Sequence, residues 1–550
     1  MPFHPPDAPL AAALDALEHG GIIPCAPAPA ASFARRLPEG DVYLYPAGQD
    51  AATLLQALDQ EPGGPRVVGV IDRSAPEEGE DERRFFGRRL IAPTTFAAMA
   101  DARVLICHSQ RETELLGILR GLGVGEDRIE TIFSHPGYRE QAESPAAAAA
   151  VLNALGARPS PRNVIIRAER SGVIVDDAAL ATALAPDETI ILNIAAPVER
   201  IASQVYQTID LYRSLGTLRR VLEQIAPQTV YLQLNLHSVH FAALVRRIVP
   251  RAVLIYEMWD LWLASVGDLR PEDYGRLVGM DDAMVDLSQR SERYLLDSAD
   301  LLISKRGGPT WEAQSRRFGA PCLQYFARVG AGGTPPAAAT GQGPATAPQR
   351  DGLRLLFAAT FQTLENLDAL DYIRPNQDHR AVFAALTADG RTTVDLYNAA
   401  HRDEGLDPLY ASYLDAYREG PIRYHRRVPP AQLLAAMDEY DYGWIRATPA
   451  VPSVDCHVVI PASLSSYIAA GLPAIVHATL TYASDLISQF DAGVVVPADE
   501  AGEQAVRRVR AAADPPRHRA GARRLRAYML ERNQQLLEAV KALNGERSRR

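Results

Sequence analysis

The chain has 550 residues, a length that predicts about three domains rather than a single core. Its formal net charge of -10 at pH 7 excludes the general basic field that holds a nucleic-acid backbone, so we expect no nucleic-acid partner. With 47% hydrophobic and 23% charged residues, the composition is that of a globular chain and excludes a disordered one.

No feature of the sequence indicates export or membrane insertion. The apolar stretch near the N-terminus is interrupted by Asp15 and Glu18 and lacks the basic start of a secretory signal. No uninterrupted apolar run reaches the roughly 18–20 residues that a membrane span needs. The sequence therefore predicts a soluble, cytoplasmic protein with no transmembrane segment. The cysteines form no Cys-x-x-Cys pair and are typical of buried thiols in a reducing compartment: Cys25, Cys107, Cys322 and Cys456.

Short β-branched apolar runs alternate with helical patterns along the chain. This alternation is typical of parallel strands joined by crossover helices, and it predicts an α/β protein built from Rossmann-like sheets. A helical stretch at residues 501–543 follows the last strand. The expected strands form three groups, which begin at Val42, Val67, Arg103 and Thr131; at Val164, Thr189, Thr229, Ala252 and Asp300; and at Leu353, Thr393, Ile422, Asp441, Pro473 and Ala492.

Two breaks in composition separate these groups. An alanine-rich stretch at residues 143–163 contains two prolines near its end, and residues 330–352 are rich in Gly, Pro, Ala and Thr, a composition typical of a linker. Open parallel sheets bind ligands at the carboxyl ends of their strands, so the cleft between the second and third domains is the expected site. We predict domains at 1–145, 160–330 and 353–545, with a linker at 331–352.

Three motifs follow one another in the last group. In this order they resemble the donor-binding half of GT-B glycosyltransferases that use nucleotide sugars, especially the large retaining family. The resemblance implies two Rossmann-like domains in a GT-B arrangement over residues 163–543, with an additional N-terminal Rossmann-like domain. The motifs are Val428-Pro429, Asp441-Tyr442-Gly443 and the segment YIAAGLP from Tyr467 to Pro473.

The residues around the last motif predict an anion-binding helix start independently of the family. Pro461 is a natural first-turn residue, Gly471 supplies a left-handed end, and Pro473 stops the helix before a buried strand. The free N–H groups at the start of such a helix suit a nucleotide diphosphate. Ser463, Ser465 and Ser466 are expected to add hydroxyl donors.

The sequence departs from the family pattern at charged positions. Val458 and Ser466 stand where retaining members usually carry two glutamates, and Thr360 and Glu365 stand where members tend to carry Arg and Lys. A carboxylate there repels phosphate, so the expected substitute cations are the arginines near the strand ends: Arg426, Arg427 and Arg446. We interpret the chain as a divergent member; a different leaving group and a loss of catalysis are the alternatives.

The acceptor-side residues come from the second group of strands, which carries a weaker form of the resemblance. His237 follows one strand and is a candidate base or hydrogen-bond donor, with a polar helix start as the alternative. Glu257 and Asp260 end another strand, where carboxylates must be paired or face a cleft, so they are catalytic candidates or structural salt-bridge partners. The predicted donor-binding residues are Thr360, Arg426, Val428, Arg446, His457, Ser463, Ser465 and Ser466.

The sequence thus predicts a glycosyltransferase that moves a sugar from a nucleotide-sugar donor to a glycan, lipid-linked or protein acceptor. No metal or cofactor is expected to be required, because a helix dipole and arginines can carry the charge of the leaving group. The alternatives are a catalytically degenerate binding or assembly protein and a sugar-nucleotide epimerase. The first domain has one turn glycine, Gly48, where a dinucleotide fingerprint has three, so we interpret that domain as accessory.

Overall fold

The structure is a computed structural model of the 550-residue chain. It has three sheets, whose strands lie at residues 41–131, 163–324 and 354–496, so the predicted α/β class is confirmed. The residues that the structure describes are 5–20, 27–34, 36, 39–60, 64–73, 75, 83–108, 112–156, 161–168, 174–194, 203–235, 238–262, 282–330, 352–361, 380–388, 390–401, 404–445 and 454–547.

The first sheet has the strand order β3-β4-β2-β1-β5-β6. Its pairs are parallel except for the antiparallel pair of β3 and β4, a short hairpin that the sequence pattern did not indicate. The strands are β1 (Asp41–Tyr45), β2 (Arg66–Ile71), β3 (Arg84–Phe85), β4 (Arg88–Ile91), β5 (Arg103–Ile106) and β6 (Ile129–Thr131). The helices are α1 (Ala8–Gly20), α2 (Pro27–Ala34), α3 (Gln49–Gln60), α4 (Pro93–Ala97), α5 (Glu112–Gly121), α6 (Pro136–Ala142) and α7 (Pro145–Ala154).

The second sheet has seven strands in the order β13-β12-β11-β10-β7-β8-β9. Its two edge strands, β9 and β13, were not predicted, because both are short and only partly buried. The strands are β7 (Asn163–Arg167), β8 (Thr189–Asn193), β9 (Gln207–Asp210), β10 (Thr229–Leu234), β11 (Val253–Met258), β12 (Leu301–Ser304) and β13 (Cys322–Gln324). The helices are α8 (Asp177–Leu180), α9 (Leu215–Ile225), α10 (Val239–Ile248), α13 (Asp282–Ser298) and α14 (Gly308–Ser315).

The third sheet is parallel in the order β16-β15-β14-β17-β18-β19, and all six of its predicted strands are confirmed. The strands are β14 (Arg354–Ala359), β15 (Thr393–Asn398), β16 (Ile422–His425), β17 (Tyr442–Trp444), β18 (Ala474–His477) and β19 (Gly493–Val496). The helices are α17 (Arg380–Thr387), α18 (Ala411–Ala416), α19 (Pro430–Ala436), α20 (Val454–Val458), α21 (Ala462–Ala469), α22 (Thr481–Phe490), α23 (Glu503–Ala512) and α24 (Pro515–Arg547).

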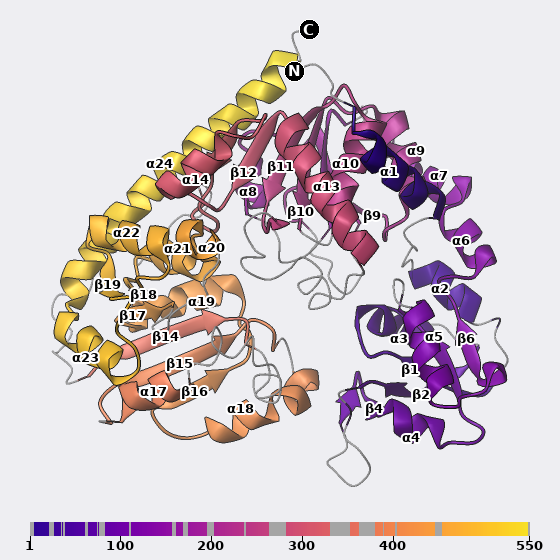
Figure 1. The fold of residues 1–550 in the computed structure, drawn as a ribbon, viewed down its shortest axis with the longest axis horizontal. Coiled ribbons are helices and arrows are strands. Elements are labelled where there is room, and N and C mark those ends of the chain that lie inside the picture. The colour runs from indigo at the N-terminus through magenta and orange to yellow at the C-terminus, as the bar shows by residue number, and fades with distance from the viewer. Residues whose placement is uncertain are drawn as a thin grey trace. The chain divides into compact units, whose positions relative to one another are not determined.

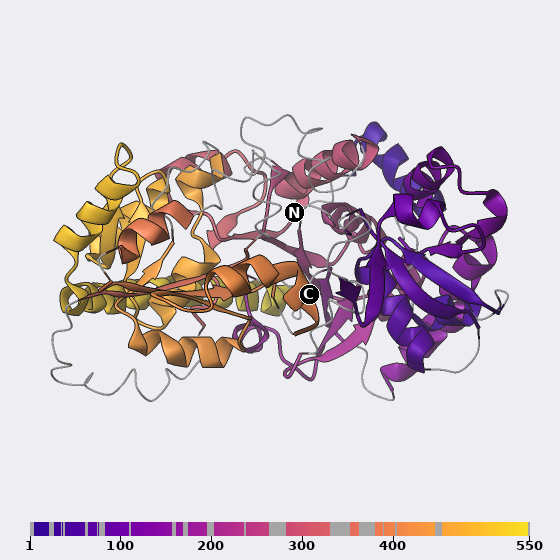
Figure 2. The same cartoon turned by 90° about the horizontal axis from the view of Figure 1, so that it is seen from below.

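Alternating side chains bury both faces of the third sheet. On β14, Leu356 packs in the cluster formed with α21, α22 and α24, whereas Leu355 and Phe357 pack in the cluster formed with α17, α18 and α23. Successive residues of a strand point to opposite faces, so a sheet covered on both sides needs continuous apolar runs such as LRLLFAA. Figure 2 shows this sheet nearly edge-on, with helices on both faces. The predicted C-terminal helical stretch is two helices, since the Pro515 ring cannot continue α23.

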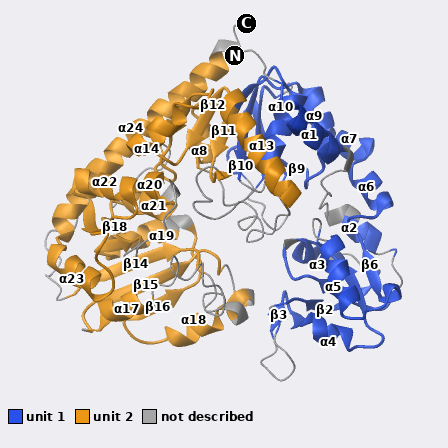
Figure 3. Ribbon diagram, in the orientation of Figure 1, with its two compact units in different colours: residues 1–172, 185–254 blue, residues 173–184, 255–550 orange. Residues whose placement is uncertain are grey.

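The chain divides into two compact units, which Figure 3 shows in different colours. One unit comprises residues 1–172 and 185–254, and the other comprises residues 173–184 and 255–550. The division falls inside β11, so residues 255–258 of that strand, with β12 and β13, are grouped with the third sheet. The predicted domain boundaries stay a prediction, and the predicted linker lies almost wholly outside the described residues.

The expectation of buried thiols is confirmed for Cys107 but not for Cys322 and Cys456, which are half-buried. Cys107, Cys322 and Cys456 are free, and Cys107 is fully buried, which raises the pKa of its thiol well above the usual range. Cys25 lies outside the described residues. Within the described ranges, none of the helices combines the length and the apolar character that crossing a bilayer requires.

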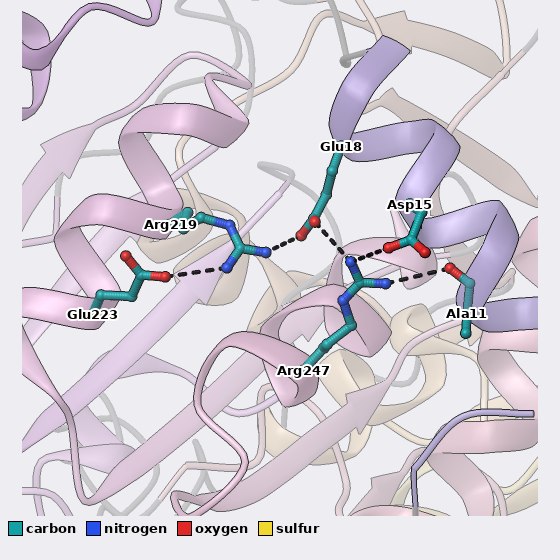
Figure 4. A network of polar contacts seen from close by, with 6 residues as sticks. All are labelled: Ala11, Asp15, Glu18, Arg219, Glu223 and Arg247. Atoms are coloured by element: carbon teal, nitrogen blue, oxygen red, sulfur yellow. Dashed lines mark hydrogen bonds and ion pairs between the residues drawn. The ribbon is translucent and has the colours of Figure 1, made fainter.

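The helix α1 docks on α9 and α10 of the second sheet, although it precedes the first sheet in sequence. Its Leu10 and Leu14, one turn apart, are buried. Figure 4 shows the polar contacts between α1 and the helices α9 and α10. Arg219 of α9 pairs with Glu18 and with Glu223 at 3.1 Å, and Arg247 of α10 reaches Glu18 at 2.7 Å, Asp15 at 2.5 Å and the carbonyl oxygen of Ala11 at 3.3 Å.

We expect Arg247→Ala to weaken the docking of α1. The substitution removes a partner of Asp15 and a partner of Glu18, and partly exposed ion pairs contribute about 0.2–1 kcal/mol each. Hydrogen exchange of the backbone amides at residues 8–20 measures the effect, and we expect it to accelerate about 10-fold. Arg251→Ala, at an exposed position just after α10, is the matched control. Equal exchange in the two variants would show that the apolar contacts alone hold α1.

Candidate functional site

Two segments of the second unit form a short backbone seam. Lys305, Arg306 and Gly307 follow β12, and Val458, Val459 and Ile460 precede α21. The N–H of Gly307 donates to the carbonyl of Val458 at 2.9 Å, and the N–H of Ile460 donates to the carbonyl of Lys305 at 3.3 Å. Arg306 and Val459 form an antiparallel bridge. The seam therefore joins the carboxyl end of β12 to the start of α21 (Figure 1).

The start of α21 offers unpaired backbone N–H groups beside this seam. Pro461 is the residue before the helix, with φ −56° and ψ 137°, and it provides no side-chain cap. The first-turn amides of Ala462, Ser463 and Leu464 have no carbonyl within the helix to bind. Among the described residues, these three amides have no hydrogen-bond acceptor. The helix ends as predicted, at Gly471 with φ +75°.

The hydroxyl groups of α21 are more enclosed than the sequence suggested. Ser463 is half-buried, whereas Ser465 and Ser466 are buried. The Ser466 hydroxyl donates its hydrogen to the carbonyl of Ala462 at 2.9 Å and accepts a hydrogen bond from Arg328 at 3.1 Å. Ser466 has therefore no hydrogen left to donate to a phosphate, and its oxygen instead positions a cation.

Trp259, Asp260 and Lys305 line the side of the seam that belongs to the second sheet. The Lys305 ammonium lies 3.1 Å from an oxygen of Asp260 and 4.3 Å from the centre of the Trp259 ring. Asp260 is 38% exposed in its side chain, so its carboxylate is accessible. An accessible carboxylate beside an ammonium and an aromatic ring can bind sugar hydroxyls and the apolar face of a sugar.

Glu257 occupies a different environment from Asp260, although the two residues are close in sequence. Glu257 is fully buried in β11, and its two carboxylate oxygens accept hydrogen bonds from the N–H groups of Ile174 and Val175, the latter at 3.4 Å. A buried carboxylate needs such donors. Glu257 thus holds the segment before α8, and we do not include it in the proposed site.

Arg328 is a cation at this site that the sequence patterns did not indicate. It lies in the turn after β13 and is exposed, and its guanidinium donates to the Ser466 hydroxyl at 3.1 Å. Among the described residues it has no carboxylate partner. Burial of the guanidinium by surrounding atoms lowers the pKa of Arg328, but an arginine remains charged at neutral pH. A turn residue with no motif around it carries no signal in a single sequence.

The predicted cation Arg426 is paired with carboxylates. Its guanidinium binds both oxygens of Asp407, at 2.8 and 2.5 Å, and also reaches Glu404. Asp407 also binds His401, which is fully buried, and these contacts, led by the hydrogen bond from Arg426, lower the pKa of Asp407. The N–H of Arg427 donates to the carbonyl of His401 at 2.8 Å. This network holds the loop that leads to Val428, which is half-buried.

Two other predicted donor-side residues are exposed at different places in the third domain. Thr360 is exposed just after β14, and His457 is exposed on α20, where its Nδ1 lies 3.0 Å from the Thr481 hydroxyl. His237 and Arg446 lie outside the described residues. Among the described residues, no cluster of three or more His, Cys, Asp or Glu side chains is arranged to hold a metal ion.

No protein-family model matches the sequence, and no curated protein matches it significantly. Solved structures that resemble it include Anabaena HepE in complex with UDP, at 13% identity and a TM-score of 0.42, over 69% of this chain and 100% of HepE. WaaG, a glycosyltransferase involved in lipopolysaccharide biosynthesis, matches at 13% identity and a TM-score of 0.41, over 69% of this chain and 99% of WaaG.

A UDP-glucosyltransferase from Polygonum tinctorium matches at 12% identity and a TM-score of 0.43, over 71% of this chain and 99% of that protein. The solved structures that resemble this chain thus include glycosyltransferases and complexes with UDP. At such low identities and TM-scores the likeness carries no argument about activity. The function has to be argued from the residues at the seam.

Proposed function

We propose that the chain is a glycosyltransferase that transfers a sugar from a nucleotide-sugar donor to a glycan, lipid-linked or protein acceptor. The observation that supports this most is the seam between residues 305–307 and 458–460. It brings the unpaired first-turn amides of α21 next to the carboxyl end of β12. An anion-binding helix start suits the diphosphate of the donor, and an accessible carboxylate suits the acceptor in an inverting reaction.

The donor side of the proposed site is the start of α21. Unpaired amides and the positive end of the helix dipole favour a phosphate group there. The three hydrogen bonds that Tyr467 makes with the ends of β14 and β17 fix the helix against the sheet: its hydroxyl accepts from the N–H of Ala358 at 2.8 Å and lies 3.5 and 3.3 Å from the carbonyls of Leu356 and Trp444. A fixed helix start presents its amides without reorganisation.

The acceptor side is formed by Asp260, Lys305 and Trp259, whereas His237 stays a candidate from the sequence alone, because it lies outside the described residues. In the transfer, the bond between the anomeric carbon and the diphosphate oxygen breaks, and a bond from that carbon to the acceptor oxygen forms. The diphosphate leaves with the bonding electron pair, and the acceptor hydroxyl loses its proton. Asp260 is the accessible carboxylate that can accept this proton in an inverting reaction.

Melting of the wild-type protein with UDP, GDP, CMP and their sugar conjugates tests the proposal. A nucleotide that binds only the folded state at 100 times its dissociation constant stabilises it by about 2.7 kcal/mol, so we expect a clear rise in melting temperature with one of them. Slow release of free sugar from the conjugate, measured by chromatography, is expected with the same nucleotide. Absence of any shift would contradict the proposal, and a shift without hydrolysis or transfer would favour a binding protein.

A variant of the helix start links the result to α21. Proline is tolerated at the first helical position, and the extended Pro461 before it is compatible with a following proline. Ala462→Pro removes one unpaired amide, so we expect an unchanged melting temperature without ligand and a smaller nucleotide shift. Ala462→Ser keeps the amide and is the control. If the nucleotide raised the melting temperature of both variants equally, the nucleotide would not bind at the start of α21.

A further inference from the structure

The turn that carries Arg328 has an unusual backbone. Arg328 has φ +65°, in the left-handed region that residues with a side chain rarely adopt. Phe326, Ala327 and Val329 around it are buried. Asn533 of α24 accepts a hydrogen bond from the N–H of Phe326 at 2.7 Å and donates to the carbonyls of Phe326 and Val329 at 2.9 and 2.5 Å. The surroundings therefore impose a conformation that an arginine does not favour.

The surroundings of Arg328 differ from those of Lys305 at the seam and from those of the predicted cation Arg426. Lys305 is paired with Asp260, and Arg426 is paired with Asp407. Among the described residues, Arg328 instead has a single hydrogen bond, to the neutral Ser466 hydroxyl. A guanidinium that no carboxylate neutralises retains its remaining donors for an anion, and its planar fork matches a phosphate.

The contact with Ser466 places this guanidinium beside the first turn of α21. Ser466 lies one turn into the helix, but its hydroxyl is bonded to the carbonyl of Ala462, the first helical residue. The guanidinium is bonded to the same hydroxyl. Arg328 and the unpaired amides of the first turn therefore lie on the same part of the helix.

We propose that Arg328 binds the diphosphate of the donor at the start of α21 and neutralises the charge that develops on it as it leaves. This assignment rests on the proposed function. In this role Arg328, which lies in the turn after β13, provides the cation that is absent at Thr360 after β14. A fixed guanidinium at the leaving group stabilises the transition state more than the ground state, because the diphosphate gains negative charge as the glycosidic bond breaks.

Calorimetric titration of the wild type and of Arg328→Gln with UDP, GDP and inorganic pyrophosphate tests the assignment. We expect the substitution to weaken the nucleoside diphosphate that the wild type binds by about 10- to 100-fold and to abolish pyrophosphate binding. The affinity for the parent nucleoside is expected to stay within about twofold, since it has no phosphate. Arg328→Lys keeps the charge without the fork and should recover part of the loss.

Arg328→Gly separates binding from folding. Glycine adopts a positive φ without strain, so this variant should melt at or above the wild-type temperature while it loses the same affinity as Arg328→Gln. Arg317→Gln, at an exposed position between α14 and β13, is the matched control and should bind as the wild type does. If the wild type and Arg328→Gln bind the nucleotide equally, the role assigned to Arg328 is overturned, but the proposed function is not. Absence of nucleotide binding in the wild type overturns the proposed function as well.

Discussion

Replacing Gly443 with alanine is expected to destabilise the third sheet by about 3 kcal/mol or more. A Cβ atom at this position of β17 would lie 2.1 Å from Cδ2 of the Tyr467 ring and 2.4 Å from its Cγ. The ring cannot move aside, since Tyr467 is fully buried and its hydroxyl is hydrogen-bonded to the N–H of Ala358. Thermal melting measures the loss, which corresponds to roughly 6–12 °C for a domain of this size.

The control for this prediction is the same substitution at Gly117. A Cβ atom there meets no heavy atom within 4 Å, and the residue lies within the helix α5, so Gly117→Ala should be neutral or stabilising. In a Tyr467→Ala variant there is no ring for the new Cβ atom to meet. Adding Gly443→Ala to that variant should therefore cause little further loss of stability. A full additive loss in the double variant would show that the ring is not the cause.

Asn533→Leu is expected to cost about 3 kcal/mol and to weaken nucleotide binding. The side chain is 1% exposed, and its replacement leaves the N–H of Phe326 and the carbonyl of Val329 buried without this partner. Each such orphaned group costs about 1–3 kcal/mol. The same bonds hold the turn with Arg328, so the guanidinium should lose its fixed position at α21. Melting measures the first effect, and titration with the nucleotide that binds the wild type measures the second.

Gln534→Leu is the matched control for Asn533→Leu. Gln534 is the next residue of α24 and is exposed, so leucine there removes no buried hydrogen bond. This variant should melt and bind as the wild type does. If Asn533→Leu lowered the melting temperature but left nucleotide affinity unchanged, the turn would not need Asn533 to present Arg328. If both variants melted alike, the hydrogen bonds to Asn533 would contribute little to stability.

Part of the candidate site was predicted by local patterns. The segment around Tyr467 forms the expected helix α21, the left-handed Gly471 and the strand β18, because each of those features depends on a few neighbouring residues. Local patterns also overextended two predicted strands. The strand expected from Thr131 ends there, since the next three N–H groups donate to the buried Glu112 carboxylate instead of to a strand. The strand expected at residues 252–262 ends at Met258.

The sequence alone determined the α/β class and the succession of strands and helices, because burial on both faces of a parallel sheet leaves a periodic record in each segment. Only the tertiary structure decided which polar residues are available for chemistry. It pairs Arg426 with Asp407, buries Glu257 against the segment before α8, and brings no carboxylate of the described residues to Arg328. Asn533 and Phe326 are 207 residues apart, and a contact at that separation leaves no local pattern, so it becomes visible only when the chain is folded.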